Sequence, residues 1–161
     1  MKAMGGILPW AIVLAVIGGA TWWLLSHDLG AGRWLLAALL IGHAVVHIMF
    51  VIPAPAATAG GPAWPFDMAR SWAVTGAGLD LGVVRAVGAV LIVVVAAGFA
   101  LAALSTAGII IPASWWQPSV AVSAVASMAI LALFFESQLV LGIGIDAVLL
   151  WAVLARAWTP G

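Results

Sequence analysis

Residues Val83 to Leu104 have the sequence VVRAVGAVLIVVVAAGFALAAL. After Arg85, which lies near its start, this segment contains no charged residue. A helix needs about 20 mostly apolar residues to cross the hydrocarbon core of a bilayer. The segment therefore predicts a membrane-spanning helix.

Four further segments are similarly apolar and meet or approach this length. The segment nearest the N-terminus is longer than the hydrophobic region of a signal peptide, about 7–15 residues, so we expect a retained helix. The fourth segment has the shortest purely apolar run, which leaves a four-span arrangement as an alternative. The five predicted spans cover residues 7–25, 34–52, 83–104, 116–135 and 138–155.

The composition agrees with a chain that has lipid as its main solvent. Of 161 residues, 66% are hydrophobic and 6% are charged, whereas soluble domains carry about 25% charged residues. Five Lys and Arg balance five Asp and Glu, so no nucleic-acid partner is expected. The chain has no cysteine, which excludes disulfides and thiolate metal sites. We predict an all-α helical bundle that forms one transmembrane domain over residues 1–161, with membrane lipids as its partners.

One long connection is predicted, over residues 53–82. It begins with Pro53-Ala54-Pro55, which breaks a helix. Further along, Asp67 can cap a short helix from Phe66 to Val74, and its tryptophans would hold this helix in the headgroup layer. Four interfacial residues are predicted in this region: Trp64, Trp72, Asp80 and Arg85. For the last of these, we expect either an ion pair with Asp80 or an extension toward lipid phosphate.

The basic residues give a weak prediction of orientation. If the N-terminus is inside, Lys2, Arg70 and Arg85 are cytoplasmic, whereas Arg33 and Arg156 are outside. Three basic residues inside against two outside satisfy the positive-inside rule, so the N-terminus is predicted to be cytoplasmic.

Three ionisable residues fall within predicted spans: His43, His47 and Asp146. Such residues are costly in a membrane and are candidates for function. The two histidines are four residues apart and share one face of a helix. His43 is ten residues from Arg33, and Asp146 is ten residues from Arg156, which places both at a depth of roughly 15 Å. A contact between a histidine and Asp146 is therefore geometrically allowed.

Four interpretations of this cluster stay open. It can be structural, with a histidine that donates to Asp146 and joins two helices. His43, His47 and Asp146 can hold a divalent metal such as zinc, manganese or iron. One histidine can bind a haem iron together with another axial ligand. The cluster can also move protons through a histidine–aspartate relay. No cofactor is our first expectation, with a divalent metal or a haem as the alternative.

Ser119, Ser123 and Ser127 recur every four residues in the predicted fourth span. We interpret them as a stripe of small residues for helix packing. No histidine is positioned in the sequence to make any of them a nucleophile, so no catalytic residue is predicted.

Several short motifs resemble those of a group of small bacterial polytopic membrane proteins that are usually labelled uncharacterised. They include Gly42-His43-x-x-x-His47 in an early helix, and Leu139 to Asp146 near the C-terminus. The resemblance covers most of the chain after about Arg33. It implies a helical bundle in a bacterial plasma membrane, and it implies no known activity.

Two classes of function follow from these features. The near absence of residues outside the predicted membrane region favours a non-catalytic accessory subunit of a membrane complex, or a binder of lipid or a small ligand. The same near absence favours an accessory subunit or a binder over an enzyme. The alternative is a small transporter, or a metal- or haem-linked redox protein, that uses His43, His47 and Asp146.

Overall fold

The computed structural model describes Gly19 and residues 30–55 and 64–155. Apart from Gly19, the predicted span 7–25 lies outside the described residues. The described residues form helices and the turns between them, and they contain no strand. This part of the chain confirms the predicted all-α class.

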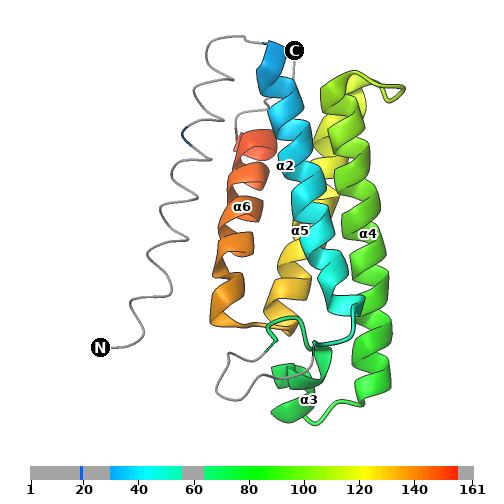
Figure 1. The fold of residues 1–161 in the computed structure, drawn as a ribbon, viewed down its shortest axis with the longest axis vertical. Coiled ribbons are helices and arrows are strands. Elements are labelled where there is room, and N and C mark those ends of the chain that lie inside the picture. Colours follow the sequence, from blue (N-terminus) through cyan, green and yellow to red (C-terminus); the bar gives the residue numbers. More distant parts are fainter. Residues whose placement is uncertain (1–18, 20–29, 56–63, 156–161) are drawn as a thin grey trace.

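Four long helices lie side by side and alternate in direction (Figure 1). Each of them, taken with its flanking turns, is long and apolar enough to cross a membrane. They also agree with four of the predicted spans to within a few residues. Their bounds are Gly30–Ile48 (α2), Leu81–Ala107 (α4), Trp116–Leu133 (α5) and Val140–Leu150 (α6), which a π-helical turn extends over Trp151–Ala155.

Polar and flexible residues mark both ends of α4. The Asp80 side chain accepts a hydrogen bond from the backbone nitrogen of Val83 at 3.0 Å, which satisfies a free N–H of the first turn. Gly108 ends the helix in the left-handed conformation, with a φ of 70°. Among the described residues, Asp80 caps α4 and makes no ion pair with Arg85, so the other expectation for Arg85, an extension toward lipid phosphate, stays a prediction.

The long connection differs from the single short helix that was predicted. It forms a 3-10 turn over Met68–Arg70 and then α3 over Trp72–Thr75. Asp67 caps the first piece as expected, by accepting from the backbone nitrogen of Ala69. The prediction of one continuous helix is wrong because Ser71 is non-helical, with a ψ of 137°, and caps α3 itself.

This connection docks on the C-terminal end of α5. The Ser71 hydroxyl donates to the carbonyl of Leu133 at 2.5 Å, and the Trp72 indole donates to the carbonyl of Ala132 at 2.7 Å. The last carbonyls of a helix have no partner within the helix. The connection supplies those partners, so it is a packed part of the fold at the end of the bundle where α3 lies (Figure 1).

Gly98 of α4 lies in tight contact with α5. A β-carbon at this position would overlap the Ser123 hydroxyl and would lie 3.3 Å from the backbone oxygen of Ser119. Val95 and Phe99 of α4 and Val120 of α5 have no exposed surface, whereas Gly98 itself is half-buried. The helix pair therefore depends on a residue without a side chain at 98.

We expect Gly98→Ala to lower the free energy of unfolding by about 1–3 kcal/mol, because the added methyl group overpacks the contact. Thermal unfolding of the purified protein in detergent, followed by circular dichroism, measures the effect. The double variant Gly98→Ala/Ser123→Ala should recover part of the loss. Gly144→Ala is the matched control because no described atom lies within 4 Å of its added carbon. Equal stability of the two single variants would contradict the assignment of Gly98 as the contact point.

Candidate functional site

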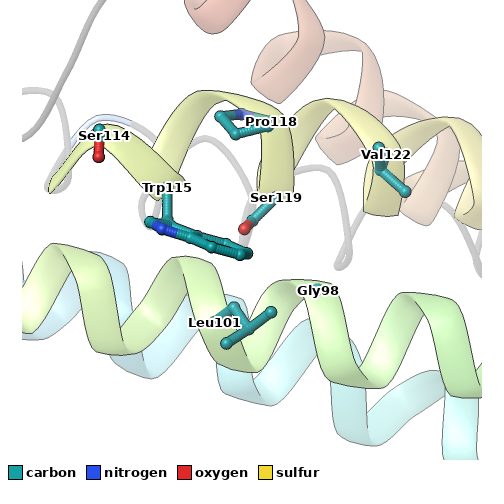
Figure 2. Close-up of a pocket in the computed structure, with 7 residues that line it drawn as sticks. All are labelled: Gly98, Leu101, Ser114, Trp115, Pro118, Ser119 and Val122. Carbon is teal, nitrogen blue, oxygen red and sulfur yellow. The ribbon is translucent and has the colours of Figure 1, made fainter. Parts of the chain in front are cut away.

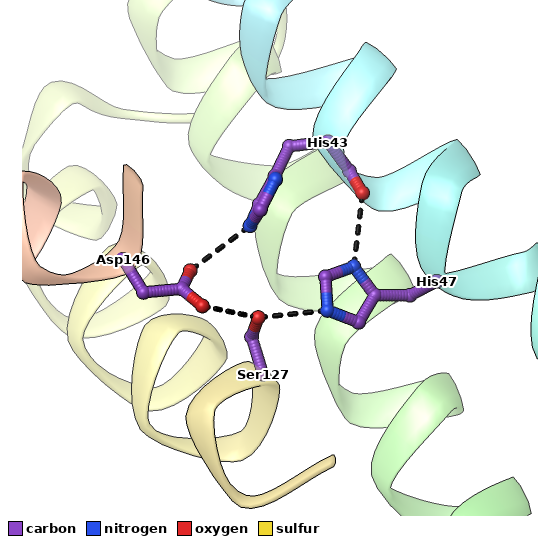
Figure 3. Close-up of polar contacts among 4 residues, drawn as sticks. All are labelled: His43, His47, Ser127 and Asp146. Atoms are coloured by element: carbon purple, nitrogen blue, oxygen red, sulfur yellow. Dashed lines mark hydrogen bonds and ion pairs between the residues drawn. The ribbon is translucent and has the colours of Figure 1, made fainter. Parts of the chain in front are cut away.

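The three ionisable residues predicted to cluster lie together inside the bundle (Figure 3). His43 and His47 are on α2, and Asp146 is on α6. Their exposed fractions are 8%, 1% and 0%. His43 Nε2 lies 2.9 Å from Asp146 Oδ1. The expected contact between the second and the last span is confirmed, and its partner is the histidine that was estimated to lie at the same depth.

Ser127 of α5 completes the cluster. Its hydroxyl oxygen lies 2.7 Å from His47 Nε2 and 2.5 Å from Asp146 Oδ2. The interpretation of Ser127 as part of a packing stripe is therefore incomplete, because its hydroxyl bridges a histidine and a carboxyl group. The depth of Ser127 in the membrane could have been estimated from the sequence. Ser127 is 11 residues from Trp116, or roughly 17 Å along the helix.

A fourth contact holds the ring of His47. Its Nδ1 donates to the backbone carbonyl of His43 at 3.0 Å. The two histidine rings meet edge to face, with centroids 4.9 Å apart, and Phe99 contacts His43 in the same way at 5.1 Å. These contacts fix both rings, and the four hydrogen bonds join α2, α5 and α6 (Figure 3). We call His43, His47, Ser127 and Asp146 the polar network.

Gly142, one turn before Asp146, lies at a close contact between α6 and its neighbours. A β-carbon there would lie 2.9 Å from Leu131 Cδ1 of α5 and 3.8 Å from His43 Cε1 of α2. The tight contact is thus with α5, and it brings α6 close to the helix that carries Ser127.

The polar network can be analysed by counting hydrogens, since each contact needs one hydrogen between its two heavy atoms. A carbonyl can only accept, so His47 carries a hydrogen on Nδ1. We assign His43 as a neutral imidazole that donates from Nε2 to Asp146 Oδ1. The Ser127 hydroxyl has one hydrogen and two partners. One more proton is needed, and it must reside on Asp146 or on His47.

Two arrangements satisfy all four contacts. In one, Asp146 is a carboxylic acid that donates to Ser127, and Ser127 donates to His47 Nε2. In the other, Ser127 donates to the Asp146 carboxylate, and the imidazolium of His47 donates to Ser127. Both have zero net charge and the same number of protons. They interconvert when one proton shifts through the Ser127 hydroxyl.

Binding of a metal ion by His43, His47 and Asp146 together does not fit this donor set. Both nitrogens of His47 and the Nε2 of His43 already contact groups of the chain itself. Among the described residues, no group of three or more His, Asp or Glu side chains is arranged to hold a metal ion. A metal at His43, His47 and Asp146 would have to break the hydrogen bonds that position these side chains.

Ser127 and His47 also have the separation of a nucleophile and its base. However, the Ser127 side chain has no exposed surface. The carbonyl of a substrate could not reach its oxygen, so the geometry favours exchange of a proton over attack on a substrate.

The four predicted interfacial residues lie toward the end of the bundle where α3 lies. Trp72, Asp80 and Arg85 are exposed, whereas Trp64 is half-buried against Phe66, with ring centroids 5.1 Å apart. Their contact with lipid headgroups stays a prediction.

Comparisons of the chain with protein-family models, with curated proteins and with solved structures found no match. The resemblance to small bacterial membrane proteins therefore stays a prediction. The polar network itself is the starting point for a proposal about function.

We expect Asp146→Asn to lower the free energy of unfolding by about 1 kcal/mol or less, and Asp146→Leu to lower it by about 3 kcal/mol. Asparagine imitates the carboxylic acid: its oxygen can accept from His43 and its amide can donate to Ser127. Leucine leaves both partners unsatisfied. Thermal unfolding of the two variants in the same detergent compares them. If asparagine destabilises as much as leucine does, the network requires a carboxylate, and the arrangement with the neutral acid is wrong.

Proposed function

We propose that this chain is a small multi-pass membrane protein that moves protons through the polar network. One observation carries the proposal: the hydroxyl of Ser127 lies within hydrogen-bond distance of both Asp146 and His47. A proton can pass between the carboxyl group and the imidazole without movement of any heavy atom. Ionisable chains of this kind are typical of proton relays in membranes.

Electrostatics supports this proposal over a fixed ion pair. A net charge buried in an apolar bundle is costly. The network avoids that cost because its shared proton keeps the site neutral in both arrangements. If one proton enters at one end of the network while another leaves at the other end, the site stays neutral, which is the property that a relay needs.

The surroundings of the network differ on its two sides. On the side toward α3, aromatic rings pack together: the centroids of Phe50 and Phe66 are 5.2 Å apart, and those of Phe50 and Phe134 are 5.3 Å apart. Phe50 and Phe134 are buried. This layer offers no polar side chain, so a proton would reach the network more readily from the opposite end.

A second candidate is the predicted non-catalytic accessory subunit or lipid binder, in which the polar network is a structural clamp. The observation in its favour is the sparse packing of α6. Only 17% of the span Ser137–Ala155 is buried inside the chain, against 50% of the span Ala113–Leu133. The exposed apolar face of α6 would then contact lipid or another membrane-protein subunit.

For location, we propose a bacterial plasma membrane with the N-terminus in the cytoplasm. Arg70 and Arg85 lie toward the end of the bundle where α3 lies, and Arg33 lies near the opposite end, at the start of α2. This distribution is compatible with the positive-inside prediction, in which the α3 end is cytoplasmic.

Proton flux into vesicles tests the proposed function. The purified protein is reconstituted in phosphatidylethanolamine and phosphatidylglycerol vesicles, and a potassium gradient with valinomycin drives protons toward an internal pH-sensitive dye. We expect flux above that of empty vesicles. Asp146→Asn should lower it by about 100-fold, the lower end of what a positioned proton-transfer group contributes, because an amide cannot release the proton.

Asp80→Asn is the matched control, since Asp80 caps α4 and lies outside the polar network. It should conduct as the wild type does. Absence of protein-dependent flux, or equal flux in Asp146→Asn and the wild type, would overturn the proposal. In that case a large loss of stability in Asp146→Leu would identify the network as the structural clamp of the second candidate.

A further inference from the structure

A groove of about 450 Å³ opens between α4 and the start of α5, away from the polar network. Its lining includes Gly98 and Leu101 of α4 and Trp115, Ser119 and Val122 on the α5 side. Figure 2 shows the Ser119 hydroxyl pointing from α5 toward α4, beside the indole ring of Trp115. The groove is thus mostly apolar, with a hydroxyl group at its inner wall.

One turn further along α5 lies Ser123, which does not itself line the groove. It has no exposed surface, and its hydroxyl oxygen has no hydrogen-bond partner among the described residues. It occupies the space beside Gly98, which lines the groove. A buried hydroxyl without a partner is costly and calls for an explanation. Water is the smallest partner that could reach it from the groove.

We propose that the groove is a water-filled entrance to the polar network, in which Ser119 and Ser123 carry protons from the groove to Ser127. This inference rests on the proposed function and adds the route by which protons arrive. Residues four apart on a helix rise by about 6 Å, about twice an O–H···O distance of about 2.8 Å. One water molecule between successive hydroxyls would therefore complete a hydrogen-bonded chain.

The route also has a suitable direction and length. Ser119 is three residues and Ser127 is 11 residues from Trp116, the first residue of α5, so the chain of hydroxyls covers about 12 Å. It leads inward from the end of the bundle opposite α3. The aromatic layer of Phe50, Phe66 and Phe134 lies on the other side of the network, so the hydroxyls provide the polar approach that this layer lacks.

A second groove between α4 and α5 provides an internal comparison. It has a similar volume, about 490 Å³, but Leu91, Ala121, Val122, Val125, Ala126 and Ala129 line it, and none of these has a polar side chain. Volume alone therefore does not distinguish the two grooves. The hydroxyl of Ser119 and the unpartnered hydroxyl of Ser123 mark the first one as the site for water.

Cysteine labelling tests for water without reference to proton transport. The chain has no cysteine, so Ser119→Cys introduces a single thiol. A charged methanethiosulfonate reagent reacts with the thiolate, which forms only where water is present: a disulfide forms and a sulfinate leaves. We expect Ser119→Cys in vesicles to be labelled much faster than Ala121→Cys, which lines the apolar groove. Equal rates for the two variants would overturn the proposed entrance.

Flux measurements then separate this inference from the proposed function. Ser123→Ala should fold, because its hydroxyl has no partner to lose, and should lose most of the wild-type proton flux. If Ser123→Ala conducts normally while Asp146→Asn does not, the route through Ser123 is wrong and the network's proposed role stands. If Ser119→Cys is labelled but the wild type conducts no protons, the groove holds water and the proposed function fails.

Discussion

The buried carboxyl group of Asp146 is the constraint on which the arrangement of the helices depends. It has no exposed surface, although α6 buries little else within the chain. A carboxyl group in an apolar interior needs hydrogen-bond partners whether or not it is ionised. His43 supplies one from α2 and Ser127 supplies the other from α5. The polar network therefore sets the axial positions of three helices, which apolar packing alone specifies weakly.

The parts of this structure that follow from length and depth could be predicted from the sequence. Apolar runs of sufficient length predicted the helices, because a helix needs a minimum length to cross the hydrocarbon core. The contact between His43 and Asp146 followed from rise per residue, because both residues lie ten positions from an arginine at the same predicted interface. Depth depends linearly on position in a helix, so this prediction needed no tertiary information.

The features that depend on rotation and local geometry could not be predicted in this way. Ser127 was assigned to packing because a serine hydroxyl changes hydropathy little, and the uniformly apolar surface of α5 does not reveal which face is inside. Ser71 interrupts the predicted helix of the long connection because its side chain can cap α3. Gly142 contacts Leu131 of α5 more tightly than α2. Each of these outcomes depends on the orientation of a helix about its own axis.

The spacing of His43 and His47 has a consequence beyond their shared helix face. The carbonyl of His43 accepts from His47 Nδ1, so that nitrogen carries a hydrogen in either arrangement of the network. The proton of variable position therefore faces Ser127, at Nε2. Without that proton, one of the two contacts of Ser127 lacks a hydrogen, and two lone pairs face each other in an apolar interior. The polar network can therefore have a structural role and a proton-carrying role at once. The proton shared by Asp146 and His47 completes the hydrogen bonds of Ser127, and the same proton is the one that can be transferred.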